Sequence, residues 1–331
     1  MIKRNVMYHN ADYIEKEARG DRLFRYPKEV LKECNPHCRN MARYACNCEL
    51  RFVTDSDTVF VNISSFSGNG DIIVYFGDFF QAKYRIAAGE TKNICILRPA
   101  ILKDGTGEKF FEKCIYSPNV IRIHFHAFMA VVGEIDALEG GVRPPKKSEL
   151  PKKTMLAYGS SITHGAGAFA SNLCYIQTAA RYLGADVINK GVGGSCFAES
   201  AVADWLSAKT DWDFAYAEIG INMVGLFDCG EFEKRYTYFI DKLSETGKTV
   251  FAPSMYLYSG TYNEGTSEKY RKFNEIIKNY HASHKRDNLH FIDGNKILPE
   301  GRWLTADGIH PSTEGHALMG FNAAEIMKEY I

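Results

Sequence analysis

The chain lacks the features that would assign it to a nucleic-acid-binding or membrane-bound class. Its 331 residues include 40 lysines and arginines and 40 aspartates and glutamates, so the formal net charge is zero. Because proteins that bind nucleic acid or an anionic membrane surface usually carry a basic excess, we expect neither partner. No run of about 18 uninterrupted apolar residues is present, so no membrane span is expected.

The N-terminus also lacks the apolar run of a secretory signal, since acids soon follow the first basic residues. The nine cysteines are odd in number and scattered, which is atypical of a disulfide framework. Cys34 and Cys38 have an acceptable zinc-ligand spacing, but Cys46 and Cys48 are too close together for the usual second pair. We therefore expect free thiols, no metal and no other cofactor, as suits a reducing cytoplasm.

The length of the chain predicts two domains, because one hydrophobic core rarely grows beyond roughly 250–300 residues. Residues of about 49–138 form short β-branched and aromatic runs separated by Gly, Asp and Ser, which predicts an antiparallel, jelly-roll-like β-sandwich. Three prolines and several lysines in 141–153 are typical of a linker. We therefore assign 1–145 to an accessory sandwich domain and 154–331 to a second domain.

The pattern changes after the linker. Short apolar runs alternate with amphipathic stretches of helical length, such as 231–246 and 266–284, which predicts a parallel sheet covered by helices on both faces. A closing helix is expected from about Ser312 to Ile331, with Ser312 or Thr313 as its N-cap. The expected strands include residues 155–158, 186–189, 214–219, 249–252 and 290–293.

In an open parallel sheet, ligands bind beyond the carboxyl ends of the strands, so chemistry is expected in the loops there. The first strand runs into Gly159-Ser160-Ser161, and the second into a glycine loop from Gly191 to Ser195. A serine hydroxyl becomes a nucleophile only when a base takes its proton, and alone either serine reads as a turn or cap residue. The glycine loop fits neither the dinucleotide-binding G-x-G-x-x-G pattern nor the P-loop.

Two further loops carry polar side chains of the right kind. The third strand runs into a Gly-x-Asn motif that ends at Asn222, and an Asp307-x-x-His310 motif follows the last strand. A carboxylate three residues before a histidine can accept its Nδ1–H and leave Nε2 free to act as a base. Alone, Asn222 reads as a turn residue and Asp-x-x-His is common by chance. Four such loops at one sheet edge together indicate an active site.

The chain order of these motifs resembles that of SGNH (GDSL-like) hydrolases over the whole second half of the chain. The resemblance implies a three-layer α/β/α fold and ester hydrolysis through an acyl-enzyme on Ser161, with His310 as base and Asp307 as its orienting partner. It also implies an oxyanion hole formed by the backbone N–H groups of Ser161 and Gly194 and the side chain of Asn222.

Two positions depart from the family pattern, and the glycine loop offers more than one candidate donor. Ser160 stands where the family usually has aspartate, so it competes with Ser161 for the nucleophile's role, although the motif register favours Ser161. Met223 also replaces the usual aspartate, which predicts an adaptable apolar side chain at the edge of the site. The loop offers three glycines, of which Gly194 is chosen as the donor.

Two further residues are candidates for contact with substrate. His164, three residues after the predicted nucleophile, reads either as a substrate contact or as hydrogen-bonding support for the turn. Trp303, just before the Asp-x-x-His turn, is a candidate to stack on a sugar, and its alternative interpretation is a core or rim residue.

A sandwich in front of an SGNH-type domain resembles the layout of two-domain carbohydrate acetyl esterases. We therefore expect a serine esterase that removes a short acyl group, acetyl by this analogy, from a small-molecule or oligosaccharide ester. Two alternatives stay open: an acyltransferase that uses the same acyl-enzyme, and a non-catalytic carbohydrate-binding protein. The intact Ser161, Asn222 and Asp307-His310 set argues against the last. The sequence is compatible with either a monomer or a homo-oligomer.

Overall fold

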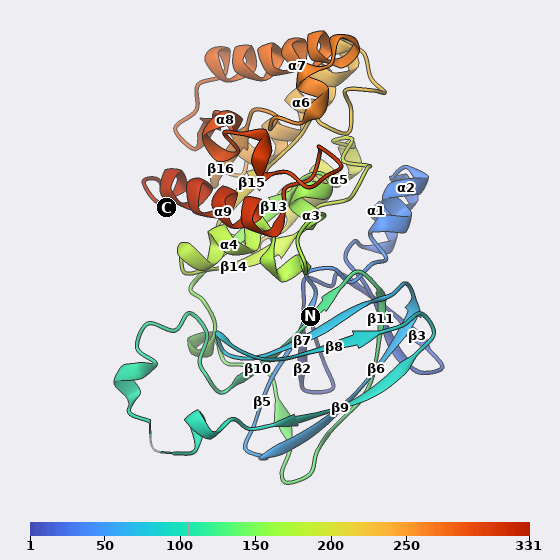
Figure 1. Ribbon diagram of the computed structural model, residues 1–331, viewed down its shortest axis with the longest axis vertical. Helices are drawn as coiled ribbons and strands as arrows, with labels where there is room; N and C mark the ends of the chain where they lie inside the picture. The colour runs from blue at the N-terminus through green and yellow to red at the C-terminus, as the bar shows by residue number, and fades with distance from the viewer. Residues whose placement is uncertain (105) are drawn as a thin grey trace. The chain divides into compact units, whose positions relative to one another are not determined.

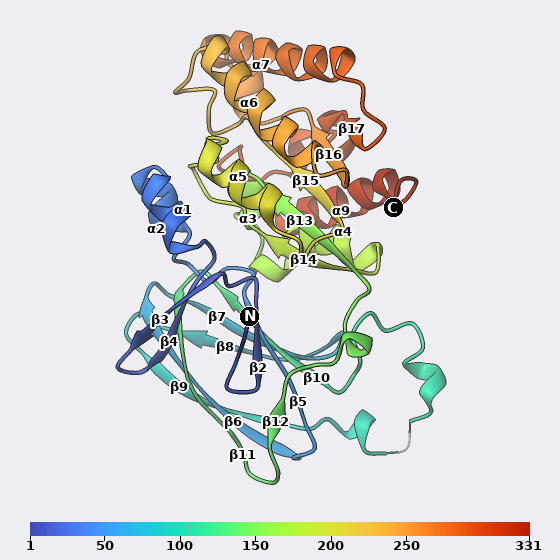
Figure 2. The ribbon, with the colours of Figure 1, turned by 180° about the vertical axis from the view of Figure 1, so that it is seen from behind.

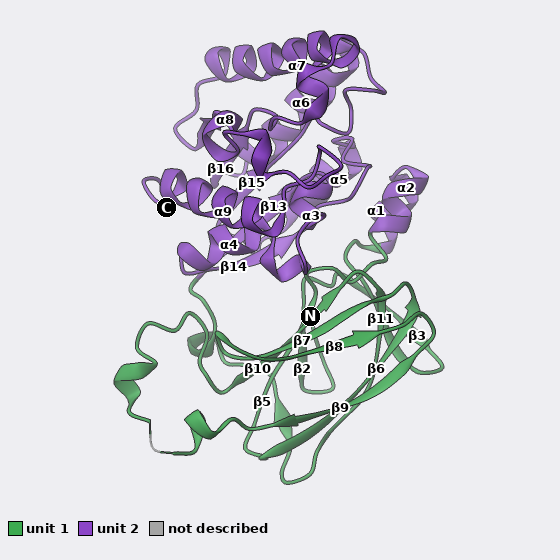
Figure 3. Ribbon diagram, viewed as in Figure 1, with its two compact units in different colours: residues 1–27, 42–152 green, residues 28–41, 153–331 purple. Residues whose placement is uncertain are grey.

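A computed structural model describes residues 1–104 and 106–331 and divides the chain into two compact units (Figure 3). Unit 1 comprises residues 1–27 and 42–152, and unit 2 comprises residues 28–41 and 153–331. Residues 28–41 thus belong to unit 2, although they lie within the range 1–145 predicted for the accessory domain.

Unit 1 is built from two antiparallel sheets. The first has the order β1-β2-β5-β10-β7-β8, with β12 also paired to β5, and the second has the order β3-β4-β11-β6-β9. The first sheet's strands are β1 (Ile2–Lys3), β2 (Val6–His9), β5 (Glu49–Thr54), β7 (Gly70–Phe76), β8 (Phe79–Ile86), β10 (Val120–His126) and β12 (Val142–Arg143). The second sheet's strands are β3 (Tyr13–Glu17), β4 (Gly20–Phe24), β6 (Thr58–Ser67), β9 (Thr91–Leu97) and β11 (Met129–Ala137).

The core of unit 1 follows the two-residue period of its strands. Val59, Val61 and Ile63 alternate along β6 and are buried in one cluster with Ile121 and Ile123 of β10. Burial of both inner faces confirms the predicted antiparallel sandwich, which begins earlier than expected because β1–β4 precede residue 49.

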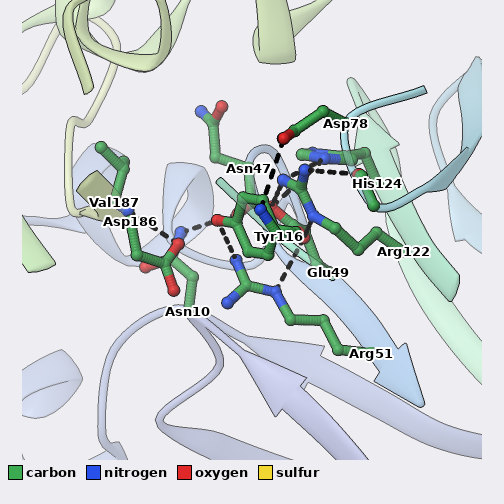
Figure 4. Close-up of polar contacts among 11 residues, drawn as sticks. Asn10, Asn47, Glu49, Arg51, Asp78, Tyr116, Arg122, His124, Asp186 and Val187 are labelled. Carbon is green, nitrogen blue, oxygen red and sulfur yellow. Dashed lines mark hydrogen bonds and ion pairs between the residues drawn. The ribbon is translucent and has the colours of Figure 1, made fainter. Parts of the chain in front are cut away.

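Unit 1 also buries a charged cluster on the paired strands β5 and β10 (Figure 4). Glu49 Oε2 accepts hydrogen bonds from Arg51 Nε at 2.8 Å and Arg122 Nε at 2.9 Å, and His124 Nε2 lies 3.2 Å from Oε1. Burial acts to raise the pKa of Glu49, but the two guanidinium groups and His124 outweigh it and hold that pKa well below its usual range. This carboxylate is therefore ionised and fully compensated.

Unit 2 contains a parallel sheet of order β14-β13-β15-β16-β17; Figure 1 labels the first four of these strands and Figure 2 also labels β17. Its strands are β13 (Lys153–Tyr158), β14 (Ala185–Asn189), β15 (Phe214–Ala217), β16 (Thr249–Pro253) and β17 (Leu289–Ile292). Its helices are α1 (Lys28–Glu33), α2 (Pro36–Met41), α3 (Ser161–His164), α4 (Tyr175–Tyr182), α5 (Ser200–Ala208), α6 (Cys229–Ser244), α7 (Glu264–Ser283), α8 (Gly294–Ile297) and α9 (Thr313–Met327).

Helices cover both faces of the parallel sheet. On one face, α4 and α9 pack together and bury Ile176 and Met319 in one cluster with Met155 of β13. On the other, the ring of Tyr158 stacks on Phe239 of α6, and α6 packs against α5 and α7 (Figure 2). This confirms the predicted three-layer α/β/α arrangement. Among the helices of the described residues, none combines the length and the apolar character needed to span a membrane.

The termini of the elements agree with local chemistry. The Ser312 hydroxyl accepts a hydrogen bond from the N–H of Gly315 at 3.1 Å, which confirms it as the N-cap of α9. Short 3₁₀ turns complete the structure at η1 (Ala100–Leu102), η2 (Glu108–Phe110), η3 (Lys147–Glu149), η4 (Ser171–Leu173), η5 (Ser259–Tyr262) and η6 (Gly301–Trp303). Because the five strands of unit 2 are parallel, the loops that carry the predicted motifs leave the sheet at one edge.

Candidate active site

The turn after β13 gives its two serines different surroundings. Ser160 is the N-cap of α3, and its hydroxyl accepts the N–H of Ile162 at 3.2 Å. Its own N–H and hydroxyl both donate to Glu218 Oε2, at 2.8 and 2.7 Å. Ser160 is only 1% exposed. Its polar groups are therefore engaged in holding the turn.

Ser161, the first residue of α3, faces a histidine. His310 Nε2 lies 2.8 Å from Ser161 Oγ, and His310 Nδ1 lies 2.7 Å from Asp307 Oδ2. The other oxygen of Asp307 accepts the backbone N–H groups of Ile309 and His310, at 2.8 and 2.9 Å. These distances allow a proton to pass from the serine to the histidine while the carboxylate fixes the ring.

The carboxylate of Asp307 is ionised at neutral pH. Burial acts to raise its pKa, but the hydrogen bonds from the His310 ring and from the backbone N–H groups of His310 and Ile309 outweigh this effect and keep the pKa well below its usual range. A charged acceptor of this kind holds the imidazole in the tautomer whose Nε2 can accept a proton.

A closed turn presents His310. The N–H of Thr305 donates to the carbonyl of His310 at 2.7 Å, and the N–H of Gly308 donates to the carbonyl of Thr305 at 3.0 Å. Gly308 has a φ of 69°, a left-handed conformation that glycine adopts without strain. Because the turn between Asp307 and His310 is tight, their side chains can form a hydrogen bond at a spacing of three residues.

The glycine loop after β14 lies against this serine. A methyl group added at Gly193 would lie 3.7 Å from Cβ of Ser161 and 3.6 Å from Nδ1 of His164. At Gly191 it would lie 2.6 Å from the backbone nitrogen of His164, so a side chain there would displace α3. Asn189 ties the loop down by donating to the carbonyl of Thr163 at 2.7 Å.

The three predicted oxyanion donors all have unused hydrogens. Asn222 Oδ1 accepts the N–H of Cys196 at 3.1 Å, which orients the amide and leaves Nδ2 unbonded to other described residues. The backbone N–H groups of Ser161 and Gly194 make no hydrogen bond within the described part of the chain. Gly194 has a φ of 65°, a left-handed backbone conformation that glycine adopts without strain. Such unpaired donors can bind a negative oxygen.

The three remaining predicted site residues are less available to a substrate. His164 is 8% exposed and Met223 is fully buried. Met223 does not lie at the open edge of the site, because its N–H closes a turn onto the carbonyl of Gly220 at 2.7 Å and its side chain enters the interior. Trp303 is half-buried and packs in part against the core of unit 2, in agreement with its core or rim interpretation.

Two features beside the serine were not predicted from sequence. The first is Glu218, which is 2% exposed and accepts hydrogen bonds from Ser160 and from the Thr163 hydroxyl at 3.1 Å. Burial raises its pKa to about 7, although the hydrogen bonds from Ser160 and Thr163 oppose the shift. A carboxylate directly after the apolar run Phe214–Ala217 was the available signal.

The second unpredicted feature is helix α2, which lies beside the glycine loop. A methyl group at Gly194 would lie 3.1 Å from Nε2 of His37, and one at Gly193 would lie 3.4 Å from Cε of Met41. His37 is exposed. Both residues belong to the segment 28–41 of unit 2, and no motif in the sequence pointed to them.

Comparison with known proteins gives both a family and several structural relatives. The GDSL-like lipase/acylhydrolase family model matches residues 157–318, whereas no curated protein matches the sequence. A salicylyl-acyltransferase from a tetracycline biosynthetic pathway superposes with a TM-score of 0.80 at 15% identity, covering 98% of this chain and 94% of the other.

Two carbohydrate-active enzymes share the same two-part layout. A family two carbohydrate esterase from Cellvibrio japonicus has a TM-score of 0.61 at 12% identity and covers 99% of this chain and 95% of its own. An acetyl xylan esterase from Butyrivibrio proteoclasticus has a TM-score of 0.57 at 12% identity, with 99% and 96% covered. At these identities the likeness shows the fold. The family match, which includes Ser161, Asn222 and His310, shows that residues 157–318 belong to the GDSL-like lipase/acylhydrolase family, a class of carboxylic ester hydrolases.

Proposed function

We propose that this protein is a serine esterase that hydrolyses a short-chain acyl ester through an acyl-enzyme on Ser161. One observation carries the proposal: His310 Nε2 lies 2.8 Å from the hydroxyl of Ser161 while its Nδ1 contacts an ionised Asp307. This arrangement activates one particular serine, and the neighbouring Ser160 is occupied with Glu218.

The proposed reaction has two halves. In the first, Ser161 Oγ attacks the ester carbonyl and its proton passes to His310 Nε2, while Asp307 stabilises the imidazolium. His310 then donates that proton to the departing alcohol, and the acyl group remains on Ser161. In the second half, water attacks the acyl-enzyme with His310 again as base, which releases the acid and restores the serine.

The tetrahedral intermediates of both halves carry a negative oxygen. We assign its stabilisation to the N–H groups of Ser161 and Gly194 and to Nδ2 of Asn222, all of which are unused by other described residues. Because these donors are positioned before the reaction, they stabilise the developing charge without reorganisation.

For the substrate we propose an acetyl ester of a carbohydrate. The support is the shared layout with a family two carbohydrate esterase and an acetyl xylan esterase, which is an analogy of fold. We further propose a reducing, cytoplasmic setting, which the nine free cysteines support.

A second candidate is acyl transfer from the same acyl-enzyme. It is favoured by the TM-score of 0.80 with a salicylyl-acyltransferase over 98% of this chain. Adding a second alcohol during turnover discriminates the two. A transferase forms the new ester at the expense of free acid, whereas a hydrolase yields free acid at any modest alcohol concentration.

The test of the proposed function is hydrolysis of p-nitrophenyl acetate and of a panel of acetylated mono- and oligosaccharides. We expect wild type to release acetate from at least one sugar and Ser161→Ala to lose this activity. Equal rates for wild type and Ser161→Ala would overturn the nucleophile assignment. No turnover of any acyl ester by folded wild type would favour a binding protein.

A further inference from the structure

Two cysteines and a glutamate lie close together in unit 2, and none of them belongs to the Ser161–His310–Asp307 set. Cys34 follows α1, Cys38 lies in α2, and Glu199 is the N-cap residue of α5. The two Sγ atoms and a carboxylate oxygen of Glu199 all lie within 4.8 Å of one another. Both thiols are buried, Cys34 at 4% and Cys38 at 1% exposure.

Asn35 positions two members of this cluster. Its backbone N–H and its Nδ2 both donate to Glu199 Oε1, at 2.6 and 3.0 Å, and its Oδ1 accepts the N–H of Cys38 at 2.9 Å. Outer partners that orient a ligand in this way are characteristic of metal sites. The same residue thus orients a carboxylate from α5 and a thiol from α2.

The other oxygen of Glu199 is buried and has no hydrogen-bond partner among the described residues. No ion pair compensates Glu199 within the described part of the chain. Leaving a buried carboxylate oxygen unsatisfied costs free energy, and a cation would supply the missing partner.

One member of the cluster also borders a surface cavity. Glu199 lines a surface cavity of about 780 Å³ together with Glu33, Glu231, Glu233 and Asp241. Lys234 and Arg235 are the basic residues among those that line it. An acidic excess of this kind raises the local concentration of cations.

We propose that Cys34, Cys38 and Glu199 bind one Zn²⁺ ion, with water as the fourth ligand. On binding, both thiols release their protons to solvent and become thiolate ligands. Thiolate ligands select zinc over magnesium or calcium, and about 2.3 Å for each Zn–S bond and about 2.0–2.2 Å for Zn–O require only small inward shifts of these side chains.

The ion would connect α2 to the start of α5. Helix α1 packs against α5, and α2 carries His37 and Met41 beside the Gly193–Gly194 turn. Zinc would therefore stabilise one wall of the candidate active site without taking part in the ester chemistry. The proposal stands independently of the proposed esterase activity.

The test is titration of chelator-treated full-length protein with Co²⁺, which reports on coordination by its absorption. We expect one equivalent to bind with tetrahedral d–d bands and a sulfur-to-cobalt charge-transfer band, and Zn²⁺ to displace it. Cys34→Ser or Cys38→Ser alone should at least halve the charge-transfer band, and the double variant should abolish it. Asn35→Ala should weaken Zn²⁺ binding by about 10–100-fold. Cys229→Ser, which changes a cysteine outside the cluster, is the matched control and should bind as wild type.

A second measurement needs no variant. In mild denaturant, which opens the buried thiols to the reagent, bound Zn²⁺ should slow alkylation of Cys34 and Cys38 in peptide mass spectrometry, while the exposed Cys95 is modified at an unchanged rate. The proposal is overturned if folded wild type binds no stoichiometric Co²⁺ or Zn²⁺, if binding survives in Cys34→Ser/Cys38→Ser, or if the resting protein contains a Cys34–Cys38 disulfide.

Discussion

A buried glutamate lies within a polar cluster in unit 1 and another in unit 2, and the two differ in the charge of the groups around them. Glu49 in unit 1 is surrounded by Arg51, Arg122 and His124, and its pKa lies well below the usual range. Glu218 in unit 2 accepts hydrogen bonds from the neutral donors of Ser160 and Thr163, and burial raises its pKa to about 7. Equal burial thus gives opposite shifts, because only the first glutamate has cations beside it.

This difference separates a structural cluster from one that supports chemistry. The ion pairs of Glu49 join β5 to β10 and lie inside the sandwich. Glu218 instead anchors Ser160 beneath the turn, and that leaves Ser161 as the serine in contact with His310.

Replacing the two adjacent serines should have unequal effects on activity. Ser161→Ala removes the proposed nucleophile and should lower kcat for p-nitrophenyl acetate by about 10⁴–10⁶-fold. Ser160→Ala removes the hydroxyl's hydrogen bond to Glu218 and its N-cap hydrogen bond from Ile162. It should lower kcat about tenfold or less, because a lost neutral hydrogen bond is worth about 1 kcal/mol and neither bond involves the reacting atoms. Comparable losses in the two variants would contradict the assignment of separate roles.

Breaking the Glu49 cluster should affect stability and leave chemistry intact. Arg122→Leu leaves a buried carboxylate with one fewer cation and should lower the free energy of unfolding by about 3–5 kcal/mol. The measurement is chemical denaturation, with kcat per folded molecule expected to match wild type. Lys272→Ala, which breaks an exposed ion pair with Glu268, is the control and should leave the denaturation midpoint unchanged.

The loop that follows Glu218 also provides a proposed oxyanion donor. Asn222→Ala removes Nδ2 from the site and should lower kcat by about 10²–10³-fold with little change in KM, since the donor acts mainly in the transition state. An effect confined to KM would instead indicate that Asn222 binds the substrate's ground state.

The two glutamates should give stability opposite dependences on pH. Folded Glu218 keeps its proton up to about pH 7, while the unfolded chain releases it near 4.5. Its contribution is therefore fully present below about pH 4.5 and is lost as pH rises through about 7, a change of about 3 kcal/mol. Glu218→Gln should remove this slope in denaturation midpoints measured from pH 5 to pH 8.

Glu49 supplies the matched comparison for that experiment. Because its folded pKa is lowered, its contribution is present above the unfolded pKa of about 4.5 and is lost as pH falls below that value. Glu49→Gln should therefore destabilise the protein at neutral pH and weaken the loss of stability below about pH 4.5. A slope that persists in Glu218→Gln and disappears in Glu49→Gln would reverse the comparison.

Sequence periodicity predicted the elements that consist mainly of buried apolar residues. The parallel strands of unit 2 are short apolar runs, and the core strands of unit 1 are β-branched and aromatic, so the parallel sheet and the core of the sandwich could be inferred. Strands β3 and β4 were missed because they are rich in charge. They pair with each other, and Arg22 of β4 forms ion pairs with Glu15 and Glu17 of β3, which no apolar pattern reveals.

The candidate site was predictable where a short motif determines local geometry. Asp307 and His310 lie in one tight turn, so their contact follows from spacing. The preference for Ser161 over Ser160 depends on Glu218, which lies on another strand, and the placement of His37 depends on the packing of two six-residue helices. Met223 was misplaced because the turn at Gly220 directs its side chain into the core.

Covalent trapping with an organophosphorus ester, followed by peptide mass mapping, identifies the nucleophilic serine. We predict one adduct per chain on Ser161, the same final labelling of Ser161 in Ser160→Ala, and no adduct in Ser161→Ala. An adduct on Ser160, or equal labelling of the Ser161→Ala variant, would contradict this prediction.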